Sequence, residues 1–196
     1  AAQAQIPVLI IGSPAREKGL SLSESYHWLS NWIGTDDNKA STDQIVSLIG
    51  TGMSSDQLTL EADRALKNCD IIIGAKRMLE MAEHYHKPTF CSYNYPAITD
   101  YMLSHPEYQH FAVLFSGDIG FYSGAKKLYD AIERTEGLEQ MEIYPVSGIS
   151  SVVYFCGKLG VSWEDVHLLS LHGRKQNLID AVKYHEKVFV LCGEKD

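Results

Sequence analysis

The chain has 196 residues, 45% of them hydrophobic and 21% charged, which is typical of a globular protein with one good core or two small lobes. Its formal net charge of −8 argues against a nucleic-acid partner, because nucleic-acid binding requires a basic surface. There is no basic start followed by an apolar leader and no apolar run long enough to span a bilayer, so we expect neither a signal peptide nor a membrane partner.

The four cysteines lie far apart and form no CxxC pair; they are Cys69, Cys91, Cys156 and Cys192. We therefore expect reduced thiols in a cytoplasmic protein. The histidines show no metal-binding spacing either, so we expect no metal site.

Residues 1–43 are predicted to form an N-terminal segment of their own. A short strand is predicted at residues 6–11 and a helix from Ser23 to Ile33, followed by a polar linker at residues 35–43. One strand and one helix bury little surface. We therefore expect this segment to dock on the following domain or to be the remnant of a fused domain.

From residue 44 onward, strands and helices alternate, which predicts an α/β fold with parallel sheets. The first lobe, residues 44–140, is expected to hold strands at 45–49, 70–74, 90–93 and 111–115 and helices at 58–68, 77–86, 97–105 and 123–134. The second lobe, residues 141–196, is expected to hold strands at 141–145, 166–171 and 188–192 and helices at 150–158 and 178–185. Each lobe should be a mostly parallel or mixed sheet with flanking helices. We expect the second lobe to be incomplete, because the sequence ends directly after a strand.

Small residues follow three of the predicted strands, where a parallel sheet presents its ligand site. In the loop Ser116–Gly120, Gly117 and Gly120 would let the backbone approach a ligand, and Asp118 could accept hydrogen bonds from hydroxyl or ammonium groups. The alternative is an ordinary strand-to-helix turn. Residues 146–151 contain Ser150 and Ser151, which could face a ligand or act as helix caps.

The turn at residues 50–52 is also glycine-rich, but it lacks the third glycine of a dinucleotide fingerprint and the Lys-Ser/Thr of a phosphate loop. A reductase lobe that binds NAD would also need an acidic residue after the second strand, where the chain has Gly74 and Ala75. The sequence therefore argues against a nucleotide-phosphate or NAD site.

Taken together, these stretches resemble the tetrapyrrole methylases, the S-adenosylmethionine enzymes of cobalamin and sirohaem synthesis. That family carries a GxGPG turn after its first strand, a GD(P)xxYG loop after its fourth and a PGxS(S/A) turn at the start of its second lobe. The corresponding stretches here are residues 50–54, 117–124 and 146–151. Within the family, residues 70–79 and 169–174 resemble the precorrin-6Y/cobalt-precorrin-7 C5-methyltransferases. Residues 1–35 resemble the closing strand and helix of the precorrin-6 reductases.

This resemblance implies a methyltransferase that uses S-adenosylmethionine to methylate C5 of a precorrin in cobalamin biosynthesis, releasing S-adenosylhomocysteine. It also implies a homodimer and fusion to, or association with, other enzymes of the pathway. The cofactor-binding residues that it implies are Met53, Ser116, Gly117, Asp118, Phe121, Ser150, Ser151 and Cys192. No catalytic acid or base is implied.

Basic side chains in or next to the motif loops are candidates for binding the carboxylates of a tetrapyrrole substrate. These candidates are Lys76, Arg77, His172 and Arg174. Lys126 and Lys127 also lie near a motif loop, but we interpret them as a solvated helix face, so that loss of the Lys127 side chain should have little effect.

Three departures from the family pattern bear on the expected function. Met53 and Ser54 replace the usual Pro-Gly, and Ile119 replaces a proline. Ala75 stands where uroporphyrinogen-methylating relatives carry an aspartate, which argues against that activity. The alternatives are a methylase of another tetrapyrrole position and a non-catalytic methylase-like domain that docks partner enzymes.

Overall fold

The computed structural model describes residues 44–171 and 176–192, all of which belong to one compact unit of the chain. The elements of these ranges are, in chain order, β1 (Ile45–Gly50), η2 (Ser55–Gln57), α2 (Leu60–Asn68), β2 (Ile71–Gly74), α3 (Lys76–Met81), η3 (Glu83–Tyr85), β3 (Thr89–Cys91), α4 (Tyr95–Ser104), β4 (His110–Phe115), α5 (Ala125–Arg134), β5 (Glu142–Val146), α6 (Ser151–Leu159), β6 (His167–Ser170), α7 (Leu178–Tyr184) and β7 (Val188–Leu191). The predictions made for residues 1–43, and for His172 and Arg174, lie outside the described residues.

The first sheet has five strands in the order β3-β2-β4-β1-β5, and every neighbouring pair is parallel. The predicted α/β class and the parallel arrangement are therefore confirmed. One assignment is wrong: residues 141–145 were placed in the second lobe, whereas β5 pairs with β1 in the first sheet. Burial explains the difference, because Val146 at the end of β5 is fully buried among residues of the first sheet and of α2 and α3.

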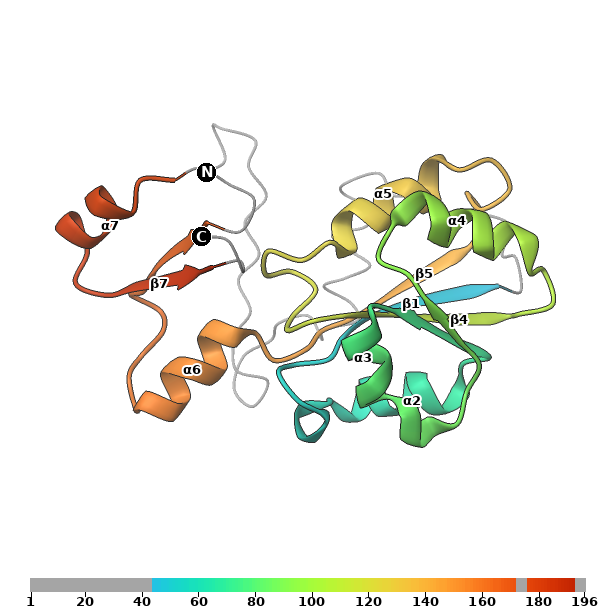
Figure 1. Cartoon of the computed structure of the whole chain (residues 1–196), viewed down its shortest axis with the longest axis horizontal. Coiled ribbons are helices and arrows are strands. Elements are labelled where there is room, and N and C mark those ends of the chain that lie inside the picture. Colours follow the sequence, from blue (N-terminus) through green and yellow to red (C-terminus); the bar gives the residue numbers. More distant parts are fainter. Residues whose placement is uncertain (1–43, 172–175, 193–196) are drawn as a thin grey trace, which may run out of the picture. The chain divides into compact units, whose positions relative to one another are not determined.

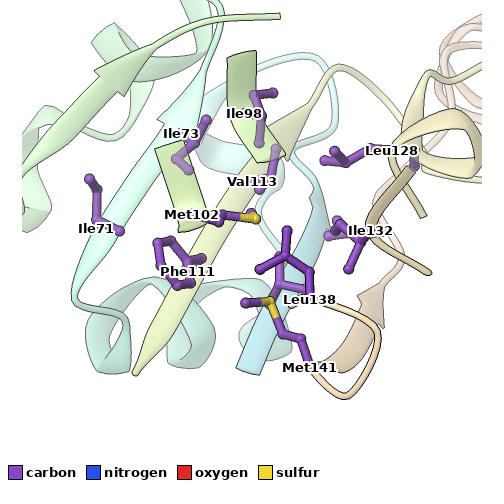
Figure 2. Close-up of a cluster of buried hydrophobic side chains, with 13 residues drawn as sticks. Ile71, Ile73, Ile98, Met102, Phe111, Val113, Leu128, Ile132, Leu138 and Met141 are labelled. Carbon is purple, nitrogen blue, oxygen red and sulfur yellow. The ribbon is translucent and has the colours of Figure 1, made fainter. Parts of the chain in front are cut away.

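Helices cover both faces of this sheet, with α4 and α5 on one face and α2 and α3 on the other (Figure 1). Successive strand residues point to opposite faces. Phe111 and Val113 of β4 therefore pack toward α4 and α5, while Ala112 and Leu114 pack toward α2 and α3. Figure 2 shows the cluster on the α4–α5 face, where the strand residues Ile71, Ile73, Phe111 and Val113 lie near Ile98, Met102, Leu128 and Ile132 of the helices.

Polar side chains cap the helices that follow the strands. The side chain of Thr59 accepts a hydrogen bond from Ala62 N at the start of α2, and that of Ser150 accepts one from Val153 N at the start of α6. The helix predicted at residues 77–86 is shorter in the structure, because α3 ends at Met81 and η3 continues with bonds to the third residue back. His86 then ends this segment in the left-handed conformation, with φ of 52°.

The second sheet consists of β6 and β7, which are parallel and joined through α7. The strands and helix predicted here are confirmed to within two residues at each end. Its buried side chains are few and include Leu169 of β6 and Ala181 of α7.

Candidate functional site

Three loops meet where β1, β4 and β5 end. Gly52 and Gly117 form an isolated antiparallel bridge between the first two loops, which we call the glycine bridge. Gly52 N donates to Gly117 O at 3.1 Å, and Gly117 N donates to Gly52 O at 2.9 Å. The third loop joins through Gly148 N, which donates to Asp118 Oδ2 at 3.1 Å. The carboxyl ends of three strands are thus held together by backbone groups.

The close approach of these loops requires glycine. A Cβ atom on Gly148 would lie 2.3 Å from Gly117 O and 2.5 Å from Gly50 O, and both of these are backbone atoms that cannot rotate away. Gly117 has φ of 70°, a conformation that residues with a side chain rarely adopt. Glycine is therefore required at residue 148 by the contact between the loops and at residue 117 by the backbone conformation.

Asp118 joins the loops through both carboxylate oxygens. Oδ1 accepts a hydrogen bond from Gly120 N at 2.8 Å, and Oδ2 accepts the one from Gly148 N. The sequence suggested that this side chain would accept bonds from a ligand. In the structure it organises the loops around the site, as a carboxylate that accepts backbone N–H groups does at a turn.

A cavity of about 690 Å³ lies beside this junction, and we call it the main cavity. Its lining residues are Met53, Arg77, Tyr95, Ser116, Gly117, Asp118, Phe121, Tyr122, Ser123, Gly124, Lys127, Ser151, Ser170, Leu191 and Cys192. The last three come from the carboxyl ends of β6 and β7, so strand ends of both sheets contribute to the lining. This is the edge at which parallel sheets bind ligands.

Seven of the eight residues predicted to bind a cofactor line the main cavity: Met53, Ser116, Gly117, Asp118, Phe121, Ser151 and Cys192. The eighth, Ser150, is not among the lining residues. Its hydroxyl oxygen lies 3.4 Å from Val153 N, at the start of α6, and the residue is buried. The structure thus places Ser150 in the capping role that the sequence left open as the alternative.

Of the basic residues considered as candidates for binding carboxylates, only some line the main cavity. Arg77 lines the main cavity, and its Nη2 donates to Ser116 Oγ at 3.2 Å. Lys76 is exposed and is not among the lining residues. Lys127 is exposed, as expected of a solvated helix face, and it also lines the cavity, which the sequence did not predict.

Several lining residues were not singled out from the sequence. Tyr122, Ser123 and Gly124 belong to the loop that carried the strongest motif, so their place in that motif was the available signal. Tyr95 gave no such signal, because it lies at the start of α4, far from the motifs in the sequence. Its hydroxyl oxygen lies 2.1 Å from the position that a Cβ atom on Gly124 would take, so Gly124 makes room for Tyr95.

In the turn after β1, a hydrogen bond to the side chain of Gln57 stabilises the backbone where the family pattern has a rigid proline. Met53 N donates to Gln57 Oε1 at 2.9 Å, a bond that the proline of the usual Pro-Gly could not make. The side chain of Gln57 therefore holds the turn in a sequence that has Met53 in place of proline.

None of the helices in residues 44–171 and 176–192 combines the length and the hydrophobicity that a membrane-spanning helix needs. The same residues contain no group of three or more His, Cys, Asp and Glu side chains that could hold a metal ion.

Comparison with known proteins identifies relatives of this chain. A probable cobalt-precorrin-7 C(5)-methyltransferase of Methanocaldococcus jannaschii is 31% identical over 154 residues, covering 75% of this chain and 71% of the relative. The cobalt-precorrin-7 C(5)-methyltransferase of Salmonella typhimurium is 28% identical over 158 residues, covering 78% of this chain and 75% of the relative.

Among solved structures, the precorrin-6Y methylase from Archaeoglobus fulgidus superposes with a TM-score of 0.56 at 22% identity, over 76% of this chain and 73% of that one. At this identity the likeness establishes the fold. The family of tetrapyrrole (corrin/porphyrin) methylases matches residues 46–192, which include both sheets and all described lining residues of the main cavity. The chain belongs to the tetrapyrrole methylases.

Proposed function

We propose that this chain is a methyltransferase that uses S-adenosylmethionine to methylate a precorrin at C5 in cobalamin biosynthesis. The observation that carries the proposal is the main cavity, which gathers seven of the eight predicted cofactor residues at the ends of the strands. The names of two relatives, both cobalt-precorrin-7 C(5)-methyltransferases, support the choice of substrate and position.

The residues of the main cavity fit S-adenosylmethionine. A volume of about 690 Å³ is within the range of small-molecule sites. Gly117 and Met53 both line the cavity, and because Gly117 has no side chain, the space beside Met53 stays open. A Cβ atom on Gly117 would lie 3.7 Å from Met53 Cε and would take up part of this space. The hydroxyls of Ser116, Ser123 and Ser151 would suit the polar groups of the cofactor, and Phe121 and Leu191 its adenine.

When bound, the cofactor would supply a methyl group on a positively charged sulfur. The protein's part is then to hold and align two reactants, which provides much of the acceleration of a bimolecular transfer. Loops fixed to one another by the glycine bridge and by Asp118 suit this task, because they hold the lining residues of the cavity in place. No lining residue needs to act as an acid or base to align the reactants, and the proton that the methyl group replaces on the substrate would pass to water.

We also propose that the protein is a homodimer in the cytoplasm. Exposed apolar side chains on α6 and α7, among them Phe155, Leu159, Ile179 and Val182, support a surface for a second copy. The four free cysteines support a reducing compartment. Sedimentation equilibrium at micromolar concentration tests the dimer, and a single monomeric species would contradict it.

The cofactor site can be tested without any substitution. Cys192 lines the main cavity, whereas Cys91 is exposed on β3 and is not among the lining residues. Saturating S-adenosylhomocysteine should therefore slow alkylation of Cys192 about tenfold or more and leave that of Cys91 unchanged. Peptide mass spectrometry after timed treatment with N-ethylmaleimide measures both rates.

A calorimetric titration with S-adenosylhomocysteine accompanies this measurement. Binding without protection of Cys192 would place the cofactor elsewhere, and absence of binding would contradict the proposal. Methylation of cobalt-precorrin-7, followed as the mass gain of one methyl group in place of one hydrogen, tests the reaction itself.

A further inference from the structure

Two neighbouring lysines at the start of α5 have different surroundings. Lys126 Nζ lies 2.7 Å from Asp130 Oδ1, one helical turn further along. Lys127 has an alanine, Ala131, at the corresponding position, and no ion pair of Lys127 occurs within the described parts of the chain. The buried residues of α5, which include Leu128 and Ile132, fix the rotation of the helix and place Lys127 at the main cavity.

Arg77 is the other cation of the main cavity, and it also reaches a second space. A hollow of about 370 Å³, which we call the side hollow, shares Arg77, Tyr95, Ser116 and Gly124 with the main cavity. The two spaces are therefore adjacent. A ligand larger than the cofactor could extend from one into the other.

The charges of these linings are unbalanced. Among the described lining residues of both spaces, Asp118 is the one carboxylate, and its two oxygens already accept hydrogen bonds from Gly120 N and Gly148 N. Arg77 and Lys127 thus face the cavity in a molecule whose formal net charge is −8. Such a local excess of positive charge attracts anions and stabilises them when they are partly removed from water.

We infer that Lys127 is a specificity-determining residue that binds a carboxylate of the ligand in the main cavity, while Arg77 binds a second carboxylate toward the side hollow. The inference rests on the proposed function, because a precorrin carries several side-chain carboxylates. A guanidinium can hold a carboxylate through two parallel hydrogen bonds, whereas an ammonium acts as a point charge. S-adenosylmethionine also carries one carboxylate, so the experiment must separate the two sources.

The experiment compares Lys127→Ala with Lys126→Ala. Both variants lose one positive charge from the same helix turn and have the same net charge, but only Lys127 lines the cavity. We expect Lys127→Ala to raise the KM for cobalt-precorrin-7 about tenfold with little change in kcat, as loss of one charge-assisted hydrogen bond would do. Lys126→Ala should keep the KM of the unmodified protein, and both variants should keep its melting temperature within a few degrees.

Two further measurements identify the source of the carboxylate and exclude a structural role. Lys127→Arg should recover most of the affinity, and the KM of the unmodified protein should rise with ionic strength more steeply than that of Lys127→Ala. If instead Lys127→Ala weakens S-adenosylhomocysteine in calorimetry and leaves the KM for cobalt-precorrin-7 unchanged, the lysine binds the carboxylate of the cofactor.

Equal KM values and equal cofactor affinities for Lys127→Ala and Lys126→Ala would overturn the inference and leave the proposed function intact. Failure of the unmodified protein to methylate cobalt-precorrin-7 would contradict the proposed function itself, whatever the variants do.

Discussion

The two sheets of this protein differ in how completely the described residues cover them. In the five-stranded sheet, β1, β2 and β4 are almost entirely buried between helices on both faces. In the two-stranded sheet, all four residues of β7 are only half-buried. The adjoining helices expose Phe155 at 53% and Ile179 at 79% of their surface. The first sheet is therefore stabilised by its own helices, while the second keeps apolar surface available to a partner.

This difference matters for the site, because the main cavity draws on both sheets. The loops after β1, β4 and β5 contribute a rigid backbone junction, whereas Ser170, Leu191 and Cys192 lie at the ends of the less covered strands. A ligand that contacts both sets of residues should suppress local opening of the second sheet, because opening of that sheet would remove part of the binding site.

The largest expected change in the free energy of unfolding comes from replacing a buried phenylalanine of the first sheet, and an exposed phenylalanine next to the second sheet provides the comparison. Phe111→Ala should lower the free energy of unfolding by about 3–5 kcal/mol, because Phe111 is fully buried between β4 and the α4–α5 face. Phe155→Ala should cost no more than about 1 kcal/mol, since half of that side chain is already exposed. Urea unfolding measures both. At protein concentrations that keep the chain monomeric, a cost at Phe155 that equals the cost at Phe111 would contradict the comparison.

Two glycines provide the next test. Gly148→Ala should destabilise the protein by about 1–3 kcal/mol, because the added methyl group meets the backbone carbonyl oxygens of Gly50, at the end of β1, and of Gly117, in the loop after β4. Gly157→Ala, within α6, meets no atom within 4 Å and should stabilise the protein by about 0.5–1 kcal/mol through helix propensity. Thermal unfolding compares the two. If Gly148→Ala left stability and cofactor binding unchanged, the loop junction would not be as tight as described.

The smallest expected effect concerns His110, at the start of β4. Burial lowers the pKa of His110 below its ordinary value of 6.5, and the ring nitrogen Nε2 lies 2.8 Å from Ser47 Oγ. The unfolded chain therefore binds this proton more tightly than the folded one. The contribution of neutral His110 to stability is present above pH 6.5 and is lost as the pH falls through that value toward the lowered pKa.

His110→Gln should consequently reduce the loss of stability between about pH 8 and about pH 5, by less than either effect above. The urea midpoint at several pH values measures this dependence. His84→Gln, at an exposed residue of η3, is the control and should keep the dependence of the unmodified protein. Identical pH profiles for His110→Gln and the unmodified protein would show that burial of His110 has no effect on acid stability.

The sequence predicted the parts of the fold that depend on local pattern. Short apolar runs marked the strands, and the small residues after β1, β4 and β5 marked the loops of the site, because close approach of backbones restricts the choice of residue. The partner of β5 was not predictable in this way, since strand pairing is decided by burial against distant residues such as those of β1.

In the site, too, the features that depend on local sequence were predictable, and those that depend on packing between distant residues were not. Motif residues were placed at the cavity, but Tyr95 reaches it only through the packing of α4 against Gly124. Which of two adjacent lysines faces the cavity depends on the rotation of α5, which the buried Leu128 and Ile132 decide. The spacing of Lys126 and Asp130 was the one local signal that separated the two lysines.

The glycine bridge has a consequence for how this family can vary. Both of its hydrogen bonds use main-chain atoms, so the sequence around them can drift while the geometry of the two loops persists. Met53 and Ser54 are an instance, with Gln57 supplying the acceptor that a different turn residue requires. A combinatorial library that varies residues 53, 54 and 57 together and retains Gly52 and Gly117 should therefore yield many folded members. These members would differ in the side chain that residue 53 presents to the main cavity.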